Sequence, residues 1–530
     1  MKTACISFLM ATACLVLPAA PPQVSDHVFG GSGEEGIRDV LPLPDGGLLL
    51  GGTLFGTSTN GNRTAASHGD TDFWIVRLDA AQQPLWDRVY GGAATDELRR
   101  MVALRDGGFL LIGGSASEPG GTRTAAREGG FDGWIVHIAE DGTPLWDRAY
   151  GGPDADRLDH GVELPDGGFL LVGTSSSEPG PAKTAALFGA SDAWAVRVDA
   201  RGNRLWDRSY GGAFAEESHA VIADRDGGSV VAGWSDSRPE AGNKTSPAHG
   251  QRDAWVLRLN DAGDILWDRS LGGRNEDWAT DVVSAPDGGL LVVGNSLSRE
   301  GGTKTSPNWS PVGGTGLASD GWLNRLDPAG TLLWDRSYGG EQADGFQRGV
   351  AGPGGYVFAG SSSSAPGGTK TSPKRFTEPF GSDGWAARVD LEGRPVWDQS
   401  YGASLTHDAS ALVQLADGSW FLTGRGLGGT NGTRTVPGFG GADGYAVRLA
   451  DDEGRLAAPT QTAEEIAAQG FRLTLTGVSN LWYRVERSPD LVRWGALATN
   501  QGVGGPHPLT DEEATNILRR FYRTRLLATP

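Results

Sequence analysis

A segment of nine residues recurs along this chain and constrains its fold more than any other feature. It reads LLWDRSYGG at 332–340 and returns as PLWDRVYGG, PLWDRAYGG, RLWDRSYGG, ILWDRSLGG and PVWDQSYGA. A second marker, Asp-X-Trp or Asp-X-Tyr, recurs at intervals of about 60 residues, a period typical of repeat architectures. Its copies begin at Asp72, Asp132, Asp192, Asp253, Asp320, Asp383 and Asp443. The sequence therefore predicts a repeat protein of seven units.

Each unit has the pattern of four short antiparallel strands. Asp-Gly-Gly separates the first two apolar runs in units one to five, and it decays to Gly-Pro-Gly-Gly in unit six and Asp-Gly-Ser in unit seven. Glycine supplies the positive φ that tight hairpin turns require. A second turn containing an acid and a glycine precedes the Trp-Asp-Arg run, as in LDPAGTLLW. The runs show no helical periodicity. Seven such units predict an all-β fold, a seven-bladed β-propeller over residues 26–456.

One copy of the nine-residue segment is missing from the last unit. Unit seven runs LADDEGRL and stops, whereas DHVFGGSG at 26–33 aligns with DRVYGGAA. We therefore expect the N-terminal strand to complete the last blade. This pairing closes the ring and removes the exposed sheet edges that an open array would leave.

The first twenty residues have the features of a secretory signal peptide. Lys2 precedes an apolar run at 4–17, and small residues and prolines follow. The protein is expected to be secreted or held in the cell envelope. Cys5 and Cys14 both lie in this segment, so the mature chain is expected to lack disulfides and thiol chemistry. A lipid anchor on Cys14 is disfavoured, because Ala11 stands where such signals carry a leucine-like residue.

The segment after the repeats differs from them. Residues 457–469 are expected to form a linker, and residues 470–530 alternate apolar and polar side chains like strands. They predict a small C-terminal β domain, sandwich-like in fold.

The charge balance excludes some partners. The chain has 46 Lys and Arg against 65 Asp and Glu, a formal net charge of −19. Such a surface argues against nucleic acid and anionic membranes as partners. No segment after the signal is apolar enough to span a membrane.

The combination of WDRSYGG, DGG and DGW resembles the tandem repeats of about 60 residues in secreted bacterial β-propellers. Those proteins are similar in style to WD40-like and quinoprotein-like propellers. The resemblance covers 26–456 and implies the fold, not a function. LTLTG, YRVERSPDLVRW and RFYR resemble a C-terminal β module of exported bacterial proteins, which implies surface retention or sorting. LDPAGTLLW is similar to blade-holding repeats of sialidases and quinoproteins, but no arginine-triad pattern, eighth unit or mature cysteine supports either chemistry.

Some charged and aromatic residues recur in every unit, and recurrence favours a structural role. A basic residue followed by Thr precedes each Asp-X-Trp, at Arg63, Arg123, Lys183, Lys244, Lys304, Lys370 and Arg434. An acid lies near the first strand of each unit, at Glu35, Asp96, Asp156, Glu216, Asp277, Asp344 and Asp408. The cations either face an anionic ligand or latch their loops to nearby acids, and seven copies favour latches. The repeated tryptophans are expected to pack between sheets rather than to stack on a ligand.

Residues that break the repeat are better candidates for a binding site. The loops after Lys304 and Lys370 are longer than the others, and Trp278 has no aromatic counterpart in neighbouring units. The candidate ligand-binding residues are Trp278, Trp309, Lys374, Arg375, Phe376 and Phe380. The alternative is that these loops only fold onto their own blades. His160, His219 and His407 lack metal-site spacing, and we predict no metal, cofactor or catalytic residues.

These observations favour an exported, non-catalytic propeller scaffold that binds a surface protein or a glycan. The alternative is a propeller enzyme acting on polysaccharide, a glycoside hydrolase or lyase, which would need paired carboxylates unmatched in other blades. A purely structural protein would have no saturable ligand.

Overall fold

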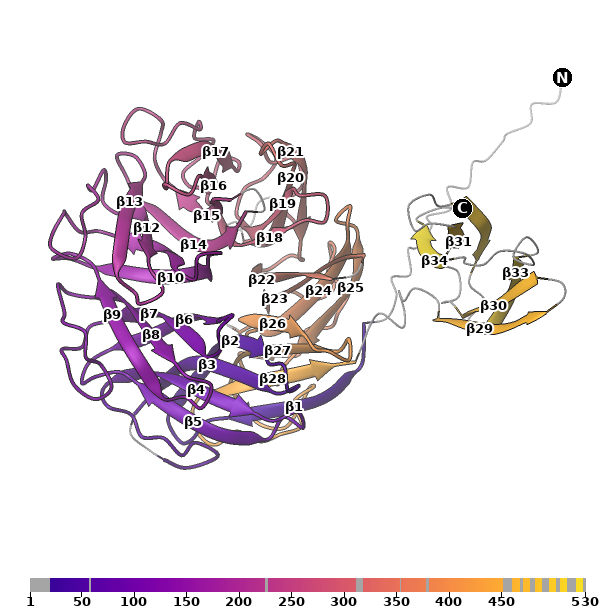
Figure 1. The fold of residues 1–530 in the computed structure, drawn as a ribbon, viewed down its shortest axis with the longest axis horizontal. Helices are drawn as coiled ribbons and strands as arrows, with labels where there is room; N and C mark the ends of the chain where they lie inside the picture. The colour runs from indigo at the N-terminus through magenta and orange to yellow at the C-terminus, as the bar shows by residue number, and fades with distance from the viewer. Residues whose placement is uncertain are drawn as a thin grey trace, which may run out of the picture.

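The computed structural model describes residues 20–56, 59–224, 227–310, 318–352, 354–377 and 381–450, followed by six strands between residues 460 and 527. Seven four-stranded antiparallel sheets form a ring (Figure 1). The predicted all-β, seven-bladed propeller is confirmed. We number the blades in chain order, so that blade 1 begins with β2 (Glu34–Pro42) and the other first strands follow it around the centre.

Each blade is built from an innermost, a second, a third and an outer strand. The other innermost strands are β6 (Asp96–Ala103), β10 (Asp156–Glu163), β14 (Glu216–Ala223), β18 (Asp277–Ser284), β22 (Asp344–Gly352) and β26 (Ala411–Gln414). The second strands are β3 (Leu48–Phe55), β7 (Phe109–Ser115), β11 (Phe169–Ser175), β15 (Ser229–Ser235), β19 (Leu290–Ser296), β23 (Gly355–Ser362) and β27 (Trp420–Gly426).

The Asp-X-Trp marker begins the third strand, and the Trp-Asp-Arg segment forms the outer strand. The third strands are β4 (Thr71–Leu78), β8 (Asp132–Ile138), β12 (Asp192–Val198), β16 (Asp253–Leu259), β20 (Asp320–Leu326), β24 (Asp383–Asp390) and β28 (Asp443–Leu449). The outer strands are β1 (Gln23–Phe29), β5 (Pro84–Tyr90), β9 (Pro144–Tyr150), β13 (Arg204–Tyr210), β17 (Ile265–Leu271), β21 (Leu332–Tyr338) and β25 (Pro395–Tyr401).

The N-terminal strand completes blade 7, as predicted. β1 pairs antiparallel with β28, with His27 opposite Ala446, in the sheet order β1-β28-β27-β26. In Figure 1 the first and last parts of the ring lie side by side. Asp26 accepts a hydrogen bond from the Thr435 backbone N–H at 2.8 Å and one from the Tyr445 hydroxyl at 3.4 Å. The ring is thus closed by the two ends of the propeller chain.

The aspartate of each Trp-Asp-Arg segment organises its blade. In blade 4, Asp268 accepts hydrogen bonds from the backbone N–H groups of Thr245 and Ser246 and from Trp255 Nε1, at 3.2, 2.8 and 2.9 Å. Burial alone would raise the pKa of Asp268, but these donors lower it, so the carboxylate stays ionised. The repeated segment therefore fastens the long loop and the third strand to the outer strand.

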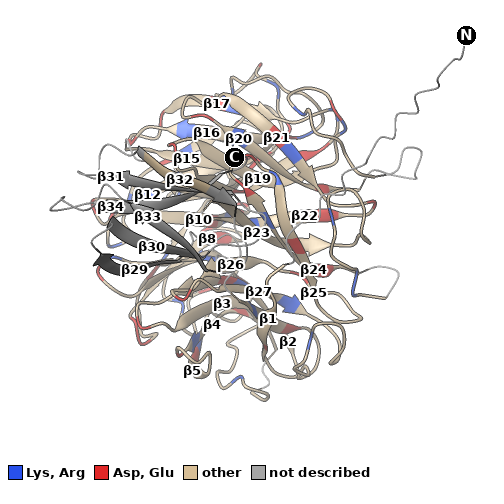
Figure 2. Ribbon diagram, turned by 90° about the vertical axis from the view of Figure 1, so that its right-hand side faces the viewer, with Lys and Arg blue, Asp and Glu red and all other residues tan. Residues whose placement is uncertain are grey.

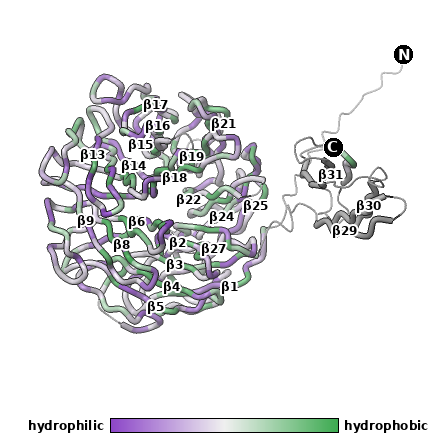
Figure 3. Tube along the Cα trace, viewed as in Figure 1, coloured by the Kyte–Doolittle hydropathy of each residue, from purple (hydrophilic) through white to green (hydrophobic). Residues whose placement is uncertain are grey.

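The hydrophobic core lies between neighbouring sheets, in seven clusters. Trp134 of blade 2 is fully buried and packs against Phe73 of blade 1, with ring centroids 4.8 Å apart. The equivalent tryptophans are buried in every blade that has one. Apolar stretches lie mainly in the strands and hydrophilic stretches mainly in the loops (Figure 3). The Asp-X-Trp tryptophans thus pack between sheets, as expected.

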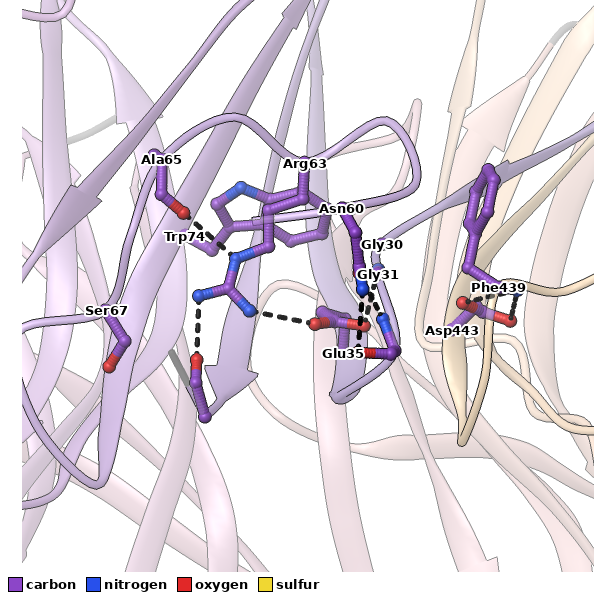
Figure 4. Close-up of polar contacts among 12 residues, drawn as sticks. Gly30, Gly31, Glu35, Asn60, Arg63, Ala65, Ser67, Trp74, Phe439 and Asp443 are labelled. Atoms are coloured by element: carbon purple, nitrogen blue, oxygen red, sulfur yellow. Dashed lines mark hydrogen bonds and ion pairs between the residues drawn. The ribbon is translucent and has the colours of Figure 1, made fainter. Parts of the chain in front are cut away.

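The recurrent cations are buried latches and do not face a ligand. Arg63 donates to Glu35 Oε1 at 3.1 Å and to the carbonyl oxygens of Ala65 and Gly56 at 3.0 and 2.7 Å (Figure 4). Lys244 Nζ donates to Ser270 Oγ at 2.6 Å. All seven cations are at most 3 % exposed. Each one therefore holds its loop inside its own blade.

The acid expected at Asp408 does not occupy the repeated position. In blade 2 the Gly92 N–H donates to Asp96 at 2.8 Å, and in blade 7 the equivalent Ala403 N–H faces His407 Nδ1 at 3.4 Å. His407 is fully buried, and burial lowers its pKa to about 4, so its imidazole is uncharged at neutral pH. The prediction was one residue out: Asp408 instead accepts hydrogen bonds from the Arg425 N–H at 2.9 Å and from Ser410 Oγ at 3.1 Å.

The strands after the propeller form two three-stranded sheets, with the orders β29-β30-β33 and β32-β31-β34. Their bounds are β29 (Thr460–Ala467), β30 (Gly470–Thr476), β31 (Trp482–Ser488), β32 (Gly495–Gln501), β33 (Pro506–Asp511) and β34 (Phe521–Leu527). This small all-β region confirms the predicted fold class. β29 lies within the residues expected as a linker.

Acidic and basic positions are interspersed over the blades in the view of Figure 2. Within the described residues, no helix has the length and apolar character needed to cross a membrane.

Candidate functional site

A bulge near the start of the innermost strands creates the lining of the central channel. In β10 the pairing with β11 shifts between Leu158 and His160, so one residue is left out of the ladder. A glycine on the second strand sits against the bulge: a Cβ on Gly173 would lie 2.0 Å from the Arg157 carbonyl oxygen. The same shift occurs in β2, β6, β14, β18 and β22. Residues around each bulge therefore turn toward the axis.

These residues line a central pocket of about 520 Å³. They are not repeated from blade to blade, unlike the rest of the strand. The lining consists of Arg38, Arg99, Arg100, Arg157, Asp159, His219, Trp278, Thr280, Gln347, Arg348, Ser361, Ser382, Asp408 and Ser410. The symmetry of the propeller is thus broken at its centre.

Four charged side chains from four blades form the floor of this pocket. Arg348 NH2 lies 2.8 Å from Asp39 Oδ1, and Arg100 lies 3.9 Å from Asp39 and 3.8 Å from Asp281. Arg100, Asp39 and Asp281 are only 6 %, 1 % and 5 % exposed. Burial raises the pKa of Asp281 to about 6, although both arginine charges lie close by. The floor is a compact ion-pair cluster that blocks the channel.

One wall of the pocket is a chain of ion pairs. Arg157 lies 2.9 Å from Asp159 and 2.5 Å from Glu217, and His219 Nε2 lies 3.1 Å from the same Glu217 oxygen. Burial would raise the pKa of Glu217, but the bond from His219 and the charge of Arg157 lower it to about 2. Glu217 is therefore ionised at any physiological pH and holds Arg157 and His219 in place.

Arg38 is the cation of this pocket that lacks a fixed partner. Its side chain is exposed to the pocket, and its guanidinium forms no ion pair or hydrogen bond with any residue that the structure describes. Arg99 is held by Glu97 at 3.0 Å and by Asp159 at 3.7 Å. Desolvation and the charge of Arg99 both lower the pKa of Arg38, whereas Asp408 raises it. A ligand carrying negative charge would relieve this unfavourable environment.

An aromatic ring and several neutral polar groups complete the lining. Trp278 is half-buried and lines both this pocket and a neighbouring hollow. Thr280, Gln347 and the three lining serines supply hydroxyl and amide groups. The pocket therefore combines a free guanidinium, an indole and uncharged hydrogen-bonding groups.

The structure separates the aromatic residues singled out in the sequence. Trp278 lines the central pocket, as described. Trp309 is half-buried; its Nε1 donates to the Ser337 carbonyl at 3.3 Å, and a Cβ on Gly368 would lie 2.8 Å from its indole ring. His249 makes the same contact with Gly302 in blade 4. Trp309 therefore occupies a repeated position.

Lys374, Arg375 and Phe376 lie in the long loop of blade 6. Lys374 and Phe376 line a second hollow, and Lys374 Nζ lies 3.8 Å from the Phe376 ring centroid. Phe376 is buried and Arg375 is half-buried, and their backbone N–H groups donate to Asp383 at 3.0 and 2.6 Å. Phe380 lies outside the described residues. Only Lys374 of this group is exposed.

Sequence reasoning missed most of the central pocket. The sequence feature that indicates this pocket lies in the innermost strands. The residues one, three and four places after the repeated acid differ from unit to unit there. Arg157, His219 and Arg348 are examples. The described residues contain no group of three or more His, Cys, Asp or Glu side chains placed to hold a metal ion.

The fold and this site define a seven-bladed β-propeller with a blind, arginine-lined central pocket. The chain matches no known family model. It is 27 % identical over 187 residues to the regulatory protein FlaEY of Caulobacter vibrioides, covering 34 % of this chain and 18 % of that protein. The chain thus spans less than a fifth of the length of this curated relative.

The chain is also similar to solved structures, among them a hydrazine synthase and a hydrolase. Kuenenia stuttgartiensis hydrazine synthase has a TM-score of 0.42 and 11 % identity, over 78 % of this chain and 95 % of that one. Puromycin hydrolase has a TM-score of 0.42 and 14 % identity, over 87 % and 62 %.

Proposed function

We propose that this protein is an exported, non-catalytic propeller that binds an acidic glycan in its central pocket, at the cell surface or outside the cell. The observation that carries the proposal is Arg38, a guanidinium exposed to the pocket with no ion-pair partner among the described residues. Arginine binds carboxylate and sulfate groups through paired N–H donors. The position of Arg38 beside Arg99 and Arg157 favours an anionic ligand.

The neutral part of the lining favours a sugar as the carrier of that anion. Trp278 offers an indole ring in the pocket, and aromatic rings combine apolar contact area with a polar edge. Thr280, Gln347 and Ser410 offer donors and acceptors that suit hydroxyl groups.

The acids of the pocket favour binding over hydrolysis. Asp159 is unmatched in other blades, as an enzyme would require, whereas Glu97 of blade 2 holds the position of Glu217. Arg157 contacts both Asp159 and Glu217. With a pKa lowered to about 2, Glu217 cannot donate a proton to a glycosidic oxygen at neutral pH. A hydrolase needs one carboxyl group that is protonated. Burial raises the pKa of Asp408, the other acid of the lining, but this carboxylate already accepts hydrogen bonds from Ser410 Oγ at 3.1 Å and from the Arg425 N–H at 2.9 Å.

Isothermal titration with hexagalacturonate, and with cellohexaose as a neutral control, tests the proposal. We expect saturable binding of the acidic sugar only. Loss of one charged contact in Arg38→Gln should weaken it about tenfold or more. Trp278→Ala should also weaken it, whereas Arg201→Gln, at an exposed turn of blade 3, should bind like the wild type. Equal binding of cellohexaose, or of polyglutamate, would overturn the proposal, as would release of shorter sugars during the titration.

A further inference from the structure

The central pocket continues into a groove that crosses the propeller face. A neighbouring hollow of about 450 Å³ shares Trp278, Gln347, Ser361 and Ser382 with the pocket. That hollow shares Ala343, Ser363 and Gly381 with a third hollow of about 590 Å³. The shared lining residues place the three spaces next to one another, from the axis over blade 6 to the long loop that carries Lys374.

The outer end of this groove carries two exposed side chains of opposite charge, Lys374 and Glu341. Lys374 is exposed and lies over the ring of the buried Phe376, which Asp383 anchors through the backbone. Glu341, also exposed, lies in the same hollow. An acidic ligand would thus meet one favourable and one unfavourable side chain here, and each can be changed separately.

The inner end of the groove is blind. Arg100 of blade 2 lies 3.8 Å from Asp281 of blade 5, and Arg348 of blade 6 lies 2.8 Å from Asp39 of blade 1. These side chains meet across the axis, and three of them are almost fully buried. A polymer therefore cannot thread the channel and can enter the pocket only by its end.

We infer that the pocket holds the terminal unit of an acidic oligosaccharide chain and that the groove over blade 6 holds the units that follow. The inference rests on the proposed function and adds the direction and length of the ligand. Arg38 and Trp278 contact the end of the chain, and Lys374 contacts a unit farther out. The glycan is thus captured by its end.

Ligands of different length separate the two parts of the site. The wild type should bind hexagalacturonate more tightly than digalacturonate. Lys374→Gln should weaken the hexamer about tenfold, the loss of one charged contact, and leave the dimer unchanged. Glu341→Gln should tighten the hexamer only. Arg38→Gln should weaken both.

The stoichiometry on long chains tests capture by the end. One protein molecule should bind per polygalacturonate chain, whatever its length, in sedimentation or light-scattering titrations. Stoichiometry that grows with length would overturn the inference, as would equal effects of Lys374→Gln on dimer and hexamer. In either case a loss of binding in Arg38→Gln would leave the proposed function standing. If no galacturonate binds to the wild type, the proposed function itself fails.

Discussion

Arg100 in blade 2 reaches Asp281 in blade 5, three blades away, with 3.8 Å between the guanidinium and the carboxylate. Neighbouring blades of the ring are joined by apolar packing. Blades 2 and 5 share no hydrophobic core cluster, and this ion pair connects them. Both side chains are almost fully buried. The pair therefore acts as a strut across the axis.

Removing one member of this strut should be costly. Arg100→Met leaves Asp281 with one cation fewer in a buried site, and such losses typically cost about 3 kcal/mol. Urea unfolding should show this loss, and the double variant Arg100→Met/Asp281→Leu should lose less than the two single variants added together. Arg201→Gln is the control and should be neutral. Additive effects would show that the pair is not coupled.

The glycine that faces each bulge should tolerate no side chain. In Gly173→Ala the new Cβ would meet the Arg157 carbonyl oxygen, so β10 must shift, at a typical cost of about 1–3 kcal/mol. Gly429→Ala is the matched control, because no atom lies within 4 Å of its Cβ position. Thermal unfolding of both variants measures the difference. Equal melting temperatures would contradict the close approach.

The ring closure at Asp26 should be more fragile than the same contact elsewhere. Asp26→Ala removes the acceptor for Thr435 and Val436, and Asp147→Ala removes the equivalent acceptor in blade 2. Each change leaves partly buried N–H groups unpaired, at a cost of up to about 1–3 kcal/mol. We expect limited proteolysis, read by mass spectrometry, to cut near β1 only in Asp26→Ala, because β1 has no hairpin to hold it. Identical fragment patterns would contradict this.

Asp320 should make the protein less stable as the pH rises. Burial raises the pKa of Asp320 to about 8, and Asp344 adds to the shift. The folded state therefore binds a proton more tightly than the unfolded state, and stability falls between the unfolded pKa of about 3.9 and pH 8. His160 and His407, whose pKa values are lowered by burial, act oppositely below about pH 6.5.

Comparison of the wild type with Asp320→Asn above that pH isolates the effect. Between pH 6.5 and 8 the wild type should lose up to about 2 kcal/mol more than the variant in urea unfolding. Lys304, with its pKa lowered by burial to about 8, titrates in the same range and interacts with Asp320, so the difference between the two proteins includes the coupling of this pair. Parallel pH profiles would show that Asp320 is ionised throughout.

The blades could be predicted from the sequence because their positions repeat. Each Trp-Asp-Arg aspartate takes the same donors, and even the displaced copy was found, since Asp26 fits the pattern of Asp87. Trp278 was identified because it breaks that pattern. Trp309 was not a break, because a ring at this position packs on the next connection in blade 4 as well, where it is His249.

The central pocket could not be predicted in the same way. Its lining depends on bulges that turn single residues such as Arg157 and Arg348 toward the axis, and a bulge leaves no clear signal in one sequence. The pairing of Arg100 with Asp281 also needs the curvature of the closed ring. Only the structure brings these residues together.

The closure by β1 also sets an order of assembly. Asp26 and Tyr445 are 419 residues apart in the chain, so the first strand of the propeller finds its partner only after every blade has been made. Contacts between such distant segments form late and slowly, because the chain between them must first become compact. Because the chain is made from its N-terminus, β1 stays unpaired and the ring stays open until β28 has been made. Pairing of β1 with β28 then closes the ring as the last step.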